Sequence, residues 1–179
     1  MKGFALGRMK VLNPRFSPAR IPHWARRYEK PPGEDEIERL GVRIRARGYL
    51  RRDEFLRLCH WKSPRTQPRC EKNSADFVES VTGVALSVEN EELRIRVLTL
   101  LHGVDWPTAS VILHFGSRQK YPILDVRALW SVGVEVPRPY GFELWWEYVR
   151  LTRNLARGQG VSMRTLDRAL WQYSKEHQP

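Results

Sequence analysis

The sequence predicts an all-α fold, on three observations. Apolar residues recur at helical spacing along much of the chain, most clearly from Val97 to Leu101 and from Ala109 to Phe115. Acidic residues, Asn or Ser precede several of these runs, as expected where helices begin. No stretch alternates apolar and polar residues in the way that is typical of a strand. With 179 residues the chain is long enough to bury a substantial core.

Composition indicates the kind of partner. The chain has 31 Lys and Arg against 20 Asp and Glu, a formal net charge of +11, which favours a polyanion, and nucleic acid before a membrane. Cys59 and Cys70 are too few for a disulfide scaffold and form no C-x-x-C pair, so we expect a reducing compartment. We expect no cofactor and no metal. No apolar run reaches membrane-spanning length. We therefore expect a cytoplasmic monomer.

Residues 1–33 differ from the rest of the chain. They carry five prolines, from Pro14 to Pro32, among arginines and lysines. Such a stretch does not sustain long helices. The sequence thus predicts a basic, Pro-rich arm over residues 1–33 and a single helical domain over residues 34–179. The arm either follows a phosphate backbone or docks on the surface through Phe16 and Trp24.

Within the domain, helices follow one another with short links. The first begins at the acids of residues 34–36 and ends near Gly48 with arginines in its last turns, which suits the helix dipole. The second runs through Phe55 and Leu58 and stops at Ser63-Pro64. Six further helices are expected, over residues 74–86, 91–101, 106–115, 126–130, 142–151 and 163–173.

A tight turn joins the two most apolar helices. His102-Gly103-Val104-Asp105 leaves room only for a sharp reversal, in which Gly103 is free to take a positive φ. Pro107 suits a first helical turn. A helix that opens after such a turn presents backbone N–H groups to a phosphate, whatever the base sequence. Two helices that merely pack together explain the same residues.

This stretch resembles the helix-hairpin-helix of the HhH-GPD superfamily of DNA base-excision glycosylases, which includes endonuclease III. The family pattern Leu-Pro-Gly-Val-Gly-x-x-Thr-Ala stands here as Leu101 to Ala109, and the family's later aspartate stands as Asp125. The iron–sulfur cysteines of some relatives are absent. The resemblance implies an all-α, two-lobed fold with a cleft at Asp125. It also implies that four hairpin residues contact the DNA backbone: Gly103, Val104, Asp105 and Thr108.

The resemblance implies that Asp125 is catalytic. Cleaving an N-glycosidic bond builds positive charge on the deoxyribose, which a carboxylate stabilises while it orients or activates water. Bifunctional relatives place a Schiff-base lysine where Pro107 stands, 18 residues (125 − 107) before Asp125. A monofunctional DNA N-glycosylase is therefore predicted, acting on a damaged or modified base flipped from the duplex. A helix N-cap is the other reading of Asp125.

Departures from the family pattern keep a second function open. Asp105 replaces the second glycine and places a carboxylate where a phosphate approaches, although it also suits a helix N-cap. A non-catalytic helix-hairpin-helix protein that binds DNA, or a protein partner, is therefore the alternative. Four residues are candidates for a base pocket, with core packing, capping or solvent exposure as their other roles: Trp61, Lys62, His114 and Tyr121.

Overall fold

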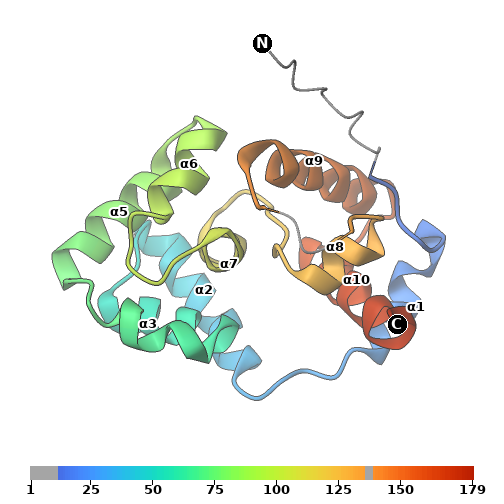
Figure 1. Ribbon diagram of the computed structural model, residues 1–179, viewed down its shortest axis with the longest axis horizontal. Helices are drawn as coiled ribbons and strands as arrows, with labels where there is room; N and C mark the ends of the chain where they lie inside the picture. Colours follow the sequence, from blue (N-terminus) through green and yellow to red (C-terminus); the bar gives the residue numbers. More distant parts are fainter. Residues whose placement is uncertain (1–11, 136–138) are drawn as a thin grey trace, which may run out of the picture.

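The computed structural model describes residues 12–135 and 139–179, and all regular secondary structure within these ranges is helical (Figure 1). The α-helices are α1 (Ile21–Arg27), α2 (Glu34–Arg47), α3 (Arg52–Lys62), α4 (Gln67–Cys70), α5 (Ala75–Ser87), α6 (Glu91–Leu98), α7 (Trp106–Gly116), α8 (Val126–Ser131), α9 (Phe142–Gly158) and α10 (Met163–His177). Two 3-10 turns, η1 (Pro18–Arg20) and η2 (Pro64–Thr66), complete the set. The all-α prediction is confirmed. No helix in these ranges combines the length and the hydropathy that crossing a membrane requires.

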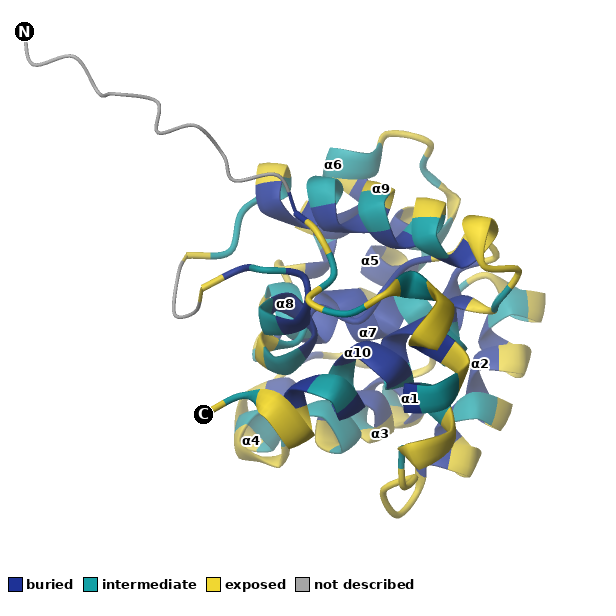
Figure 2. Ribbon diagram, turned by 90° about the vertical axis from the view of Figure 1, so that its right-hand side faces the viewer, coloured by how far each residue is buried: buried dark blue, intermediate teal, exposed yellow. Residues whose placement is uncertain are grey.

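The helices form two groups that lie side by side (Figure 1). In one group α2, α3, α5, α6 and α7 pack on one another, and in the other α1, α8 and α9 pack on α10. Figure 2 shows α7 and α10 in the middle of the molecule, where most residues of α7 and one face of α10 are buried. The chain passes between the groups at residues 28–33 and 117–125, so both links lie where the groups meet.

The described part of the Pro-rich stretch, residues 12–33, contains helix and docks through Phe16 and Trp24, which is one of the two alternatives that the sequence leaves open. Residues 18–27 form η1 and α1, and Ile21 and Trp24 are buried. Trp24 contacts Tyr173 of α10 edge-on, with 5.3 Å between the ring centroids. Proline allows this helix because Pro22 stands in its first turn, where a missing N–H costs no hydrogen bond. The helical body thus begins before residue 34, and residues 1–11 of the predicted arm lie outside the described ranges.

The helix before the hairpin is shorter than the apolar pattern indicates. α6 ends at Leu98, and the chain then turns, with the Leu101 N–H donating to the Leu98 carbonyl at 3.2 Å. Leu101 is buried, whereas Leu100 is 61% exposed. The apolar run therefore continues beyond the helix because the turn itself packs Leu101 into the core.

Candidate functional site

A cavity of about 170 Å³ has Asp125 in its wall. Its lining comes from both groups of helices: the end of α3, the start of α8, one face of α10 and the segment that precedes α2. Three aromatic side chains line it, namely Tyr28, Trp61 and Trp171. Four charged side chains also line it, namely Lys62, Asp125, Arg164 and Asp167. The cavity therefore combines flat apolar surfaces with buried charge.

Asp125 is held at three atoms. Its Oδ1 accepts the backbone N–H of Arg127 at 3.0 Å, and its carbonyl accepts that of Leu129 at 2.9 Å, so it caps α8. The ammonium of Lys62 donates to Oδ2 at 2.7 Å. Burial raises the pKa of Asp125, but the charge and hydrogen bond of Lys62 and the Arg127 N–H outweigh it and hold the pKa below its ordinary value. The side chain is 24% exposed, so a charged carboxylate faces the cavity.

The end of α3 brings two predicted pocket residues to Asp125. Lys62 is the last residue of α3, which stops because Pro64 opens η2. Trp61 packs edge-on against Phe115 of α7 at a centroid distance of 5.6 Å. Its indole N–H is buried and has no hydrogen-bond partner in the described parts of the chain. Trp61 and Lys62, two of the four candidates for a base pocket, therefore lie together in the wall of the cavity.

A buried ionic network forms the α10 side of the cavity. Arg164 donates to Oδ2 of Asp167 at 2.5 Å, and the backbone N–H of Ile123 donates to Oδ1 at 3.2 Å. Arg164 also contacts the fully buried Glu34 at 2.7 Å. The hydroxyl of Tyr28 donates to the same Glu34 carboxylate at 2.8 Å. This network ties the segment before α2 to α10, which closes the cavity on that side.

The pKa of Asp167 is shifted in the opposite direction from that of Asp125. Burial raises the pKa of Asp167 to about 6, and the charge of Asp125 adds to this, while Arg164 and Lys62 oppose it. Within one cavity, the pKa of Asp125 is thus lowered and the pKa of Asp167 is raised.

A groove of about 300 Å³ adjoins the cavity, and Lys62 and Asp125 line both. The turn before α7 and its first residues form one side of this groove, η2 with Arg65 forms another, and Tyr140 also lines it. Three of the four predicted hairpin residues line the groove: Gly103, Asp105 and Thr108. Val104 is instead buried in the core.

The hairpin has the predicted backbone conformation. Gly103 has φ +80°, and an alanine Cβ at this position would lie 2.6 Å from Sγ of Cys70. Asn73, which is buried, holds the turn by accepting the His102 N–H at 2.9 Å and donating to the His102 carbonyl at 3.0 Å. The turn is therefore pinned against α4 and the residues that follow it.

The start of α7 offers few donors to a phosphate. Oδ1 of Asp105 accepts the Trp106 N–H at 2.7 Å, so Asp105 caps the helix, which was one of its two readings in the sequence. Pro107 has no N–H. The carboxylate of Asp105 is exposed at the same helix end. Contacts to an anion in this groove therefore depend more on side chains than on the helix N-terminus.

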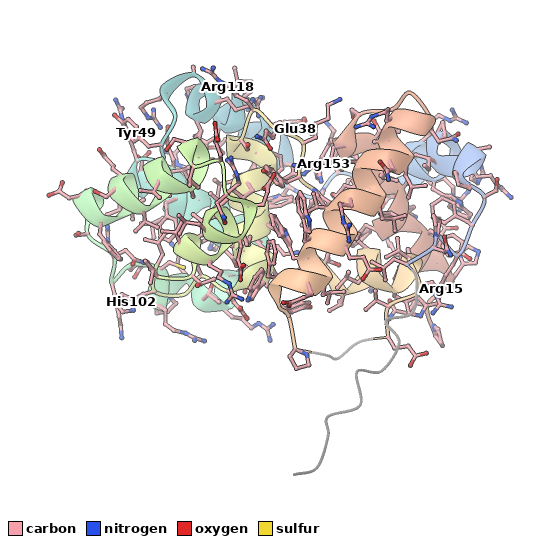
Figure 3. The ribbon with its side chains drawn as sticks, turned by 90° about the horizontal axis from the view of Figure 1, so that it is seen from above. Arg15, Glu38, Tyr49, His102, Arg118 and Arg153 are labelled. Carbon is pink, nitrogen blue, oxygen red and sulfur yellow. The ribbon has the colours of Figure 1, made fainter. Side chains whose placement is uncertain are left out.

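His114 and Tyr121, the other two predicted pocket residues, lie apart from the cavity. They line a separate groove with Glu38 and Arg118. In the view of Figure 3, Glu38 and Arg118 lie on the opposite side from His102 of the hairpin. Burial, with Arg164 adding to it, lowers the pKa of His114 to about 3.

Both residues have structural partners. Nδ1 of His114 lies 2.7 Å from the Tyr121 carbonyl. The Tyr121 hydroxyl donates to Glu91 at 2.6 Å, and its ring stacks on Trp145 at a centroid distance of 5.7 Å. These contacts tie the link between α7 and α8 to α6 and α9.

Sequence reasoning missed four residues of the cavity: Tyr28, Arg164, Asp167 and Trp171. The sequence does indicate that three of them lie together, because positions 164, 167 and 171 are spaced as i, i+3 and i+7 and share one helix face. That face lies beside the apolar stripe from which the sequence predicts α10. Tyr28 stands in the Pro-rich segment and carries no local signal.

Comparison of the chain with models of protein families, with curated proteins and with solved structures gave no match. Among the residues that the structure describes, no group of His, Cys, Asp or Glu side chains is placed to hold a metal ion. The chemistry of the cavity and its groove is therefore the basis for assigning a function.

Proposed function

We propose that this chain is a monofunctional DNA N-glycosylase of the HhH-GPD type, which removes a damaged or modified base flipped out of a duplex. The observation that carries the proposal is the place of Asp125, whose carboxylate lies where the aromatic cavity and the hairpin groove adjoin. The two groups of helices and the turn between α6 and α7 support the two-lobed, helix-hairpin-helix assignment.

The cavity suits a single flipped base. A base that leaves the stack needs flat surfaces to replace its neighbours, and Tyr28, Trp61 and Trp171 provide them. Hydrogen-bonding groups must meet its edge, and the pair of Arg164 and Asp167 lines the cavity. The lining thus supports base binding by stacking together with polar contacts.

Asp125 suits the bond-breaking step. As the bond from C1′ to the base nitrogen lengthens, positive charge grows on the deoxyribose, and a nearby carboxylate in a partly buried site stabilises it. The same oxygen atoms are able to accept a proton from the attacking water. Lys62 keeps the carboxylate charged and the α8 cap keeps it in place. Lys62 is therefore a positioning residue in this mechanism.

The groove suits the DNA strand that carries the base. Arg65 lines it, and Arg69 and Lys72 are exposed on the adjoining segment around α4. These cations supply contacts to phosphates that do not depend on base sequence, in keeping with the net charge of +11. The base would then enter the cavity past Lys62 and Asp125, which line both spaces.

A panel of duplexes tests the proposal. Each duplex carries one altered base, and released base and abasic sites are measured with wild type and with Asp125→Asn. We expect release from at least one duplex and a loss of about 10²-fold or more in Asp125→Asn. Asp76→Asn, an exposed acid in the first turn of α5, is the matched control and should retain full activity. The catalytic role of Asp125 would be refuted if wild type released no base from any duplex, or if Asp125→Asn released a base as fast as wild type.

One observation favours the alternative, a non-catalytic DNA-binding module. Both carboxylate oxygens of Asp125 already accept a hydrogen bond, Oδ1 from the Arg127 N–H and Oδ2 from the Lys62 ammonium. A purely structural residue that caps α8 and pairs with Lys62 would have the same contacts. Salt-dependent duplex binding that Asp125→Asn leaves unchanged, with no base released, would support this function.

A further inference from the structure

Asp167 is a second carboxyl group in the cavity, and the mechanism above does not use it. It projects from α10 into the same space as Asp125 and is only 7% exposed. The Ile123 N–H and Arg164 hold it in place at 3.2 and 2.5 Å. A buried acid in the wall of a base-sized cavity is in a position to contact the base itself.

Burial is the main factor that favours a proton on Asp167, and the positive charges of Arg164 and Lys62 oppose it. Three carboxylates, Glu34, Glu38 and Asp167, share two guanidinium groups, those of Arg164 and Arg168. Arg164 contacts Asp167 at 2.5 Å and Glu34 at 2.7 Å, and Arg168 contacts Glu34 and, at 2.6 Å, Glu38. Lys30 also lies 3.7 Å from Glu38, so three cations serve the three carboxylates, and Asp167 shares Arg164 with Glu34.

The groups that face Asp167 come from several elements. They are Arg164 on its own helix, Lys62 from α3, Asp125 from the start of α8, Tyr148 from α9 and Tyr28 from the segment before α2. Lys62 is bound to Asp125 at 2.7 Å and so is largely committed to that carboxylate. Burial raises the pKa of Asp167 to about 6.

Two carboxyl groups in one cavity whose pKa values are shifted in opposite directions are suited to act as a base and an acid. The carboxylate of Asp125 stays charged, because Lys62 overcomes the effect of burial on its pKa. Asp167 is more deeply buried, and this burial raises its pKa to about 6, so it takes up a proton as the pH falls toward 6. Enzymes that need an acid and a base in one site separate two carboxyl groups in this way.

We propose that Asp167 is a catalytic residue, the general acid that protonates the departing base, and that the substrates are modified bases that carry no charge while attached to DNA. The inference rests on the proposed N-glycosylase function. An uncharged base that leaves without a proton leaves as an anion, whereas an alkylated, cationic base leaves neutral without help. Only the first kind needs the proton of Asp167.

The step balances as a hydrolysis. The bond from C1′ to the base nitrogen breaks, its electron pair goes to the base, and the proton of Asp167 goes to a ring nitrogen. Water adds to C1′ and gives its proton to Asp125. Asp125 releases that proton to solvent, and Asp167 takes one up. The products are a neutral base and an abasic deoxyribose with a hydroxyl group at C1′.

Two kinds of duplex test the inference. One kind carries an uncharged modified base, with hypoxanthine, 1,N6-ethenoadenine, 8-oxoguanine and uracil as separate probes, and the other carries cationic 7-methylguanine. Single-turnover release is measured from pH 5 to pH 9 with wild type, Asp167→Asn and Asp167→Glu. Asp76→Asn is the control, and thermal unfolding followed by circular dichroism reports whether each variant is folded.

For wild type we expect release of an uncharged base whose rate falls about tenfold per pH unit above pH 6, because the acid loses its proton. Asp167→Asn should lower this rate about 10²-fold and remove the pH dependence. Asp167→Glu should restore part of the rate together with its decline at high pH. Any release of 7-methylguanine should change less than threefold in Asp167→Asn.

Several results would overturn the inference while leaving the proposed function intact. They are release of 7-methylguanine alone, a rate for uncharged bases that Asp167→Asn leaves unchanged, and a wild-type rate that does not decline above pH 6. The last result decides the matter even if Asp167→Asn does not fold. Failure to release any base from any duplex, by contrast, would overturn the proposed function and this inference with it.

Discussion

Replacing Gly103 with alanine tests the geometry of the hairpin. Gly103 has φ +80°, in the left-handed region that side chains avoid. The added Cβ would lie 2.6 Å from Sγ and 2.9 Å from the backbone nitrogen of Cys70. The backbone contact is the more serious of the two, because α4 would have to move as a whole to relieve it.

Two costs add in this variant. The left-handed conformation costs alanine about 1–2 kcal/mol, and overpacking against Cys70 costs about 1–3 kcal/mol more. Gly48→Ala is a matched control, because Gly48 has φ +88° and a Cβ added there would meet no atom within 4 Å. It should therefore show only the first cost. The difference between the two variants isolates the contact between the hairpin and α4.

Urea unfolding followed by circular dichroism measures both losses in the free energy of unfolding. We expect Gly103→Ala to lose about 2–5 kcal/mol and Gly48→Ala about 1–2 kcal/mol. Equal losses in the two variants would refute the packing of Gly103 on Cys70. A Gly103→Ala variant as stable as wild type would also refute the left-handed turn.

Three further predictions concern the groove and the cavity. Asn73→Ala removes three hydrogen bonds of 2.8 to 3.0 Å and should cost about 2–4 kcal/mol in urea unfolding. Arg65→Gln combined with Arg69→Gln should weaken duplex binding uniformly across sequences and reduce the slope of log K against log salt by about 1 for each arginine that binds a phosphate. Borohydride should trap no covalent complex with abasic DNA, because the Lys62 amine is ion-paired with Asp125 at 2.7 Å.

Each of these predictions has a control. Asn90→Ala removes a single exposed cap hydrogen bond at the start of α6 and should cost only about 1 kcal/mol; an equal loss in both variants would argue against the Asn73 clamp. Replacement of Arg39 and Arg43 with glutamine, on exposed positions of α2 away from the groove lining, should leave the salt slope unchanged. A trapped complex that Lys62→Gln abolishes would show a lyase step and contradict the monofunctional assignment.

Local features of this chain were predictable from its sequence. The apolar periodicity of α7, the cap at Asp125 and the left-handed turn at Gly103 each depend on residues within a few positions of one another. Steric and hydrogen-bonding rules act at that range, so the pattern records them. The same rules misplaced the end of α6, because Leu101 is buried by a turn whose course depends on Asn73.

Only part of the cavity lining was predictable from the sequence. Trp61 and Lys62 were identified by residue type, but nothing in the sequence shows that Lys62 reaches Asp125, 63 residues later. His114 and Tyr121 have equally suitable chemistry and lie in another groove. Which side of a helix meets a cavity depends on the packing of whole helices, and that packing is not encoded at any single spacing.

The sequence by itself determined an all-helical chain with a glycine hairpin, a basic charge and an isolated acid at the start of α8, because these follow from composition and short-range patterns. Only the tertiary structure decided that Asp125 shares a cavity with Asp167 and Tyr28. The physical reason is that α3, α8 and α10 are distant in sequence, and burial of their apolar faces brings their polar ends together.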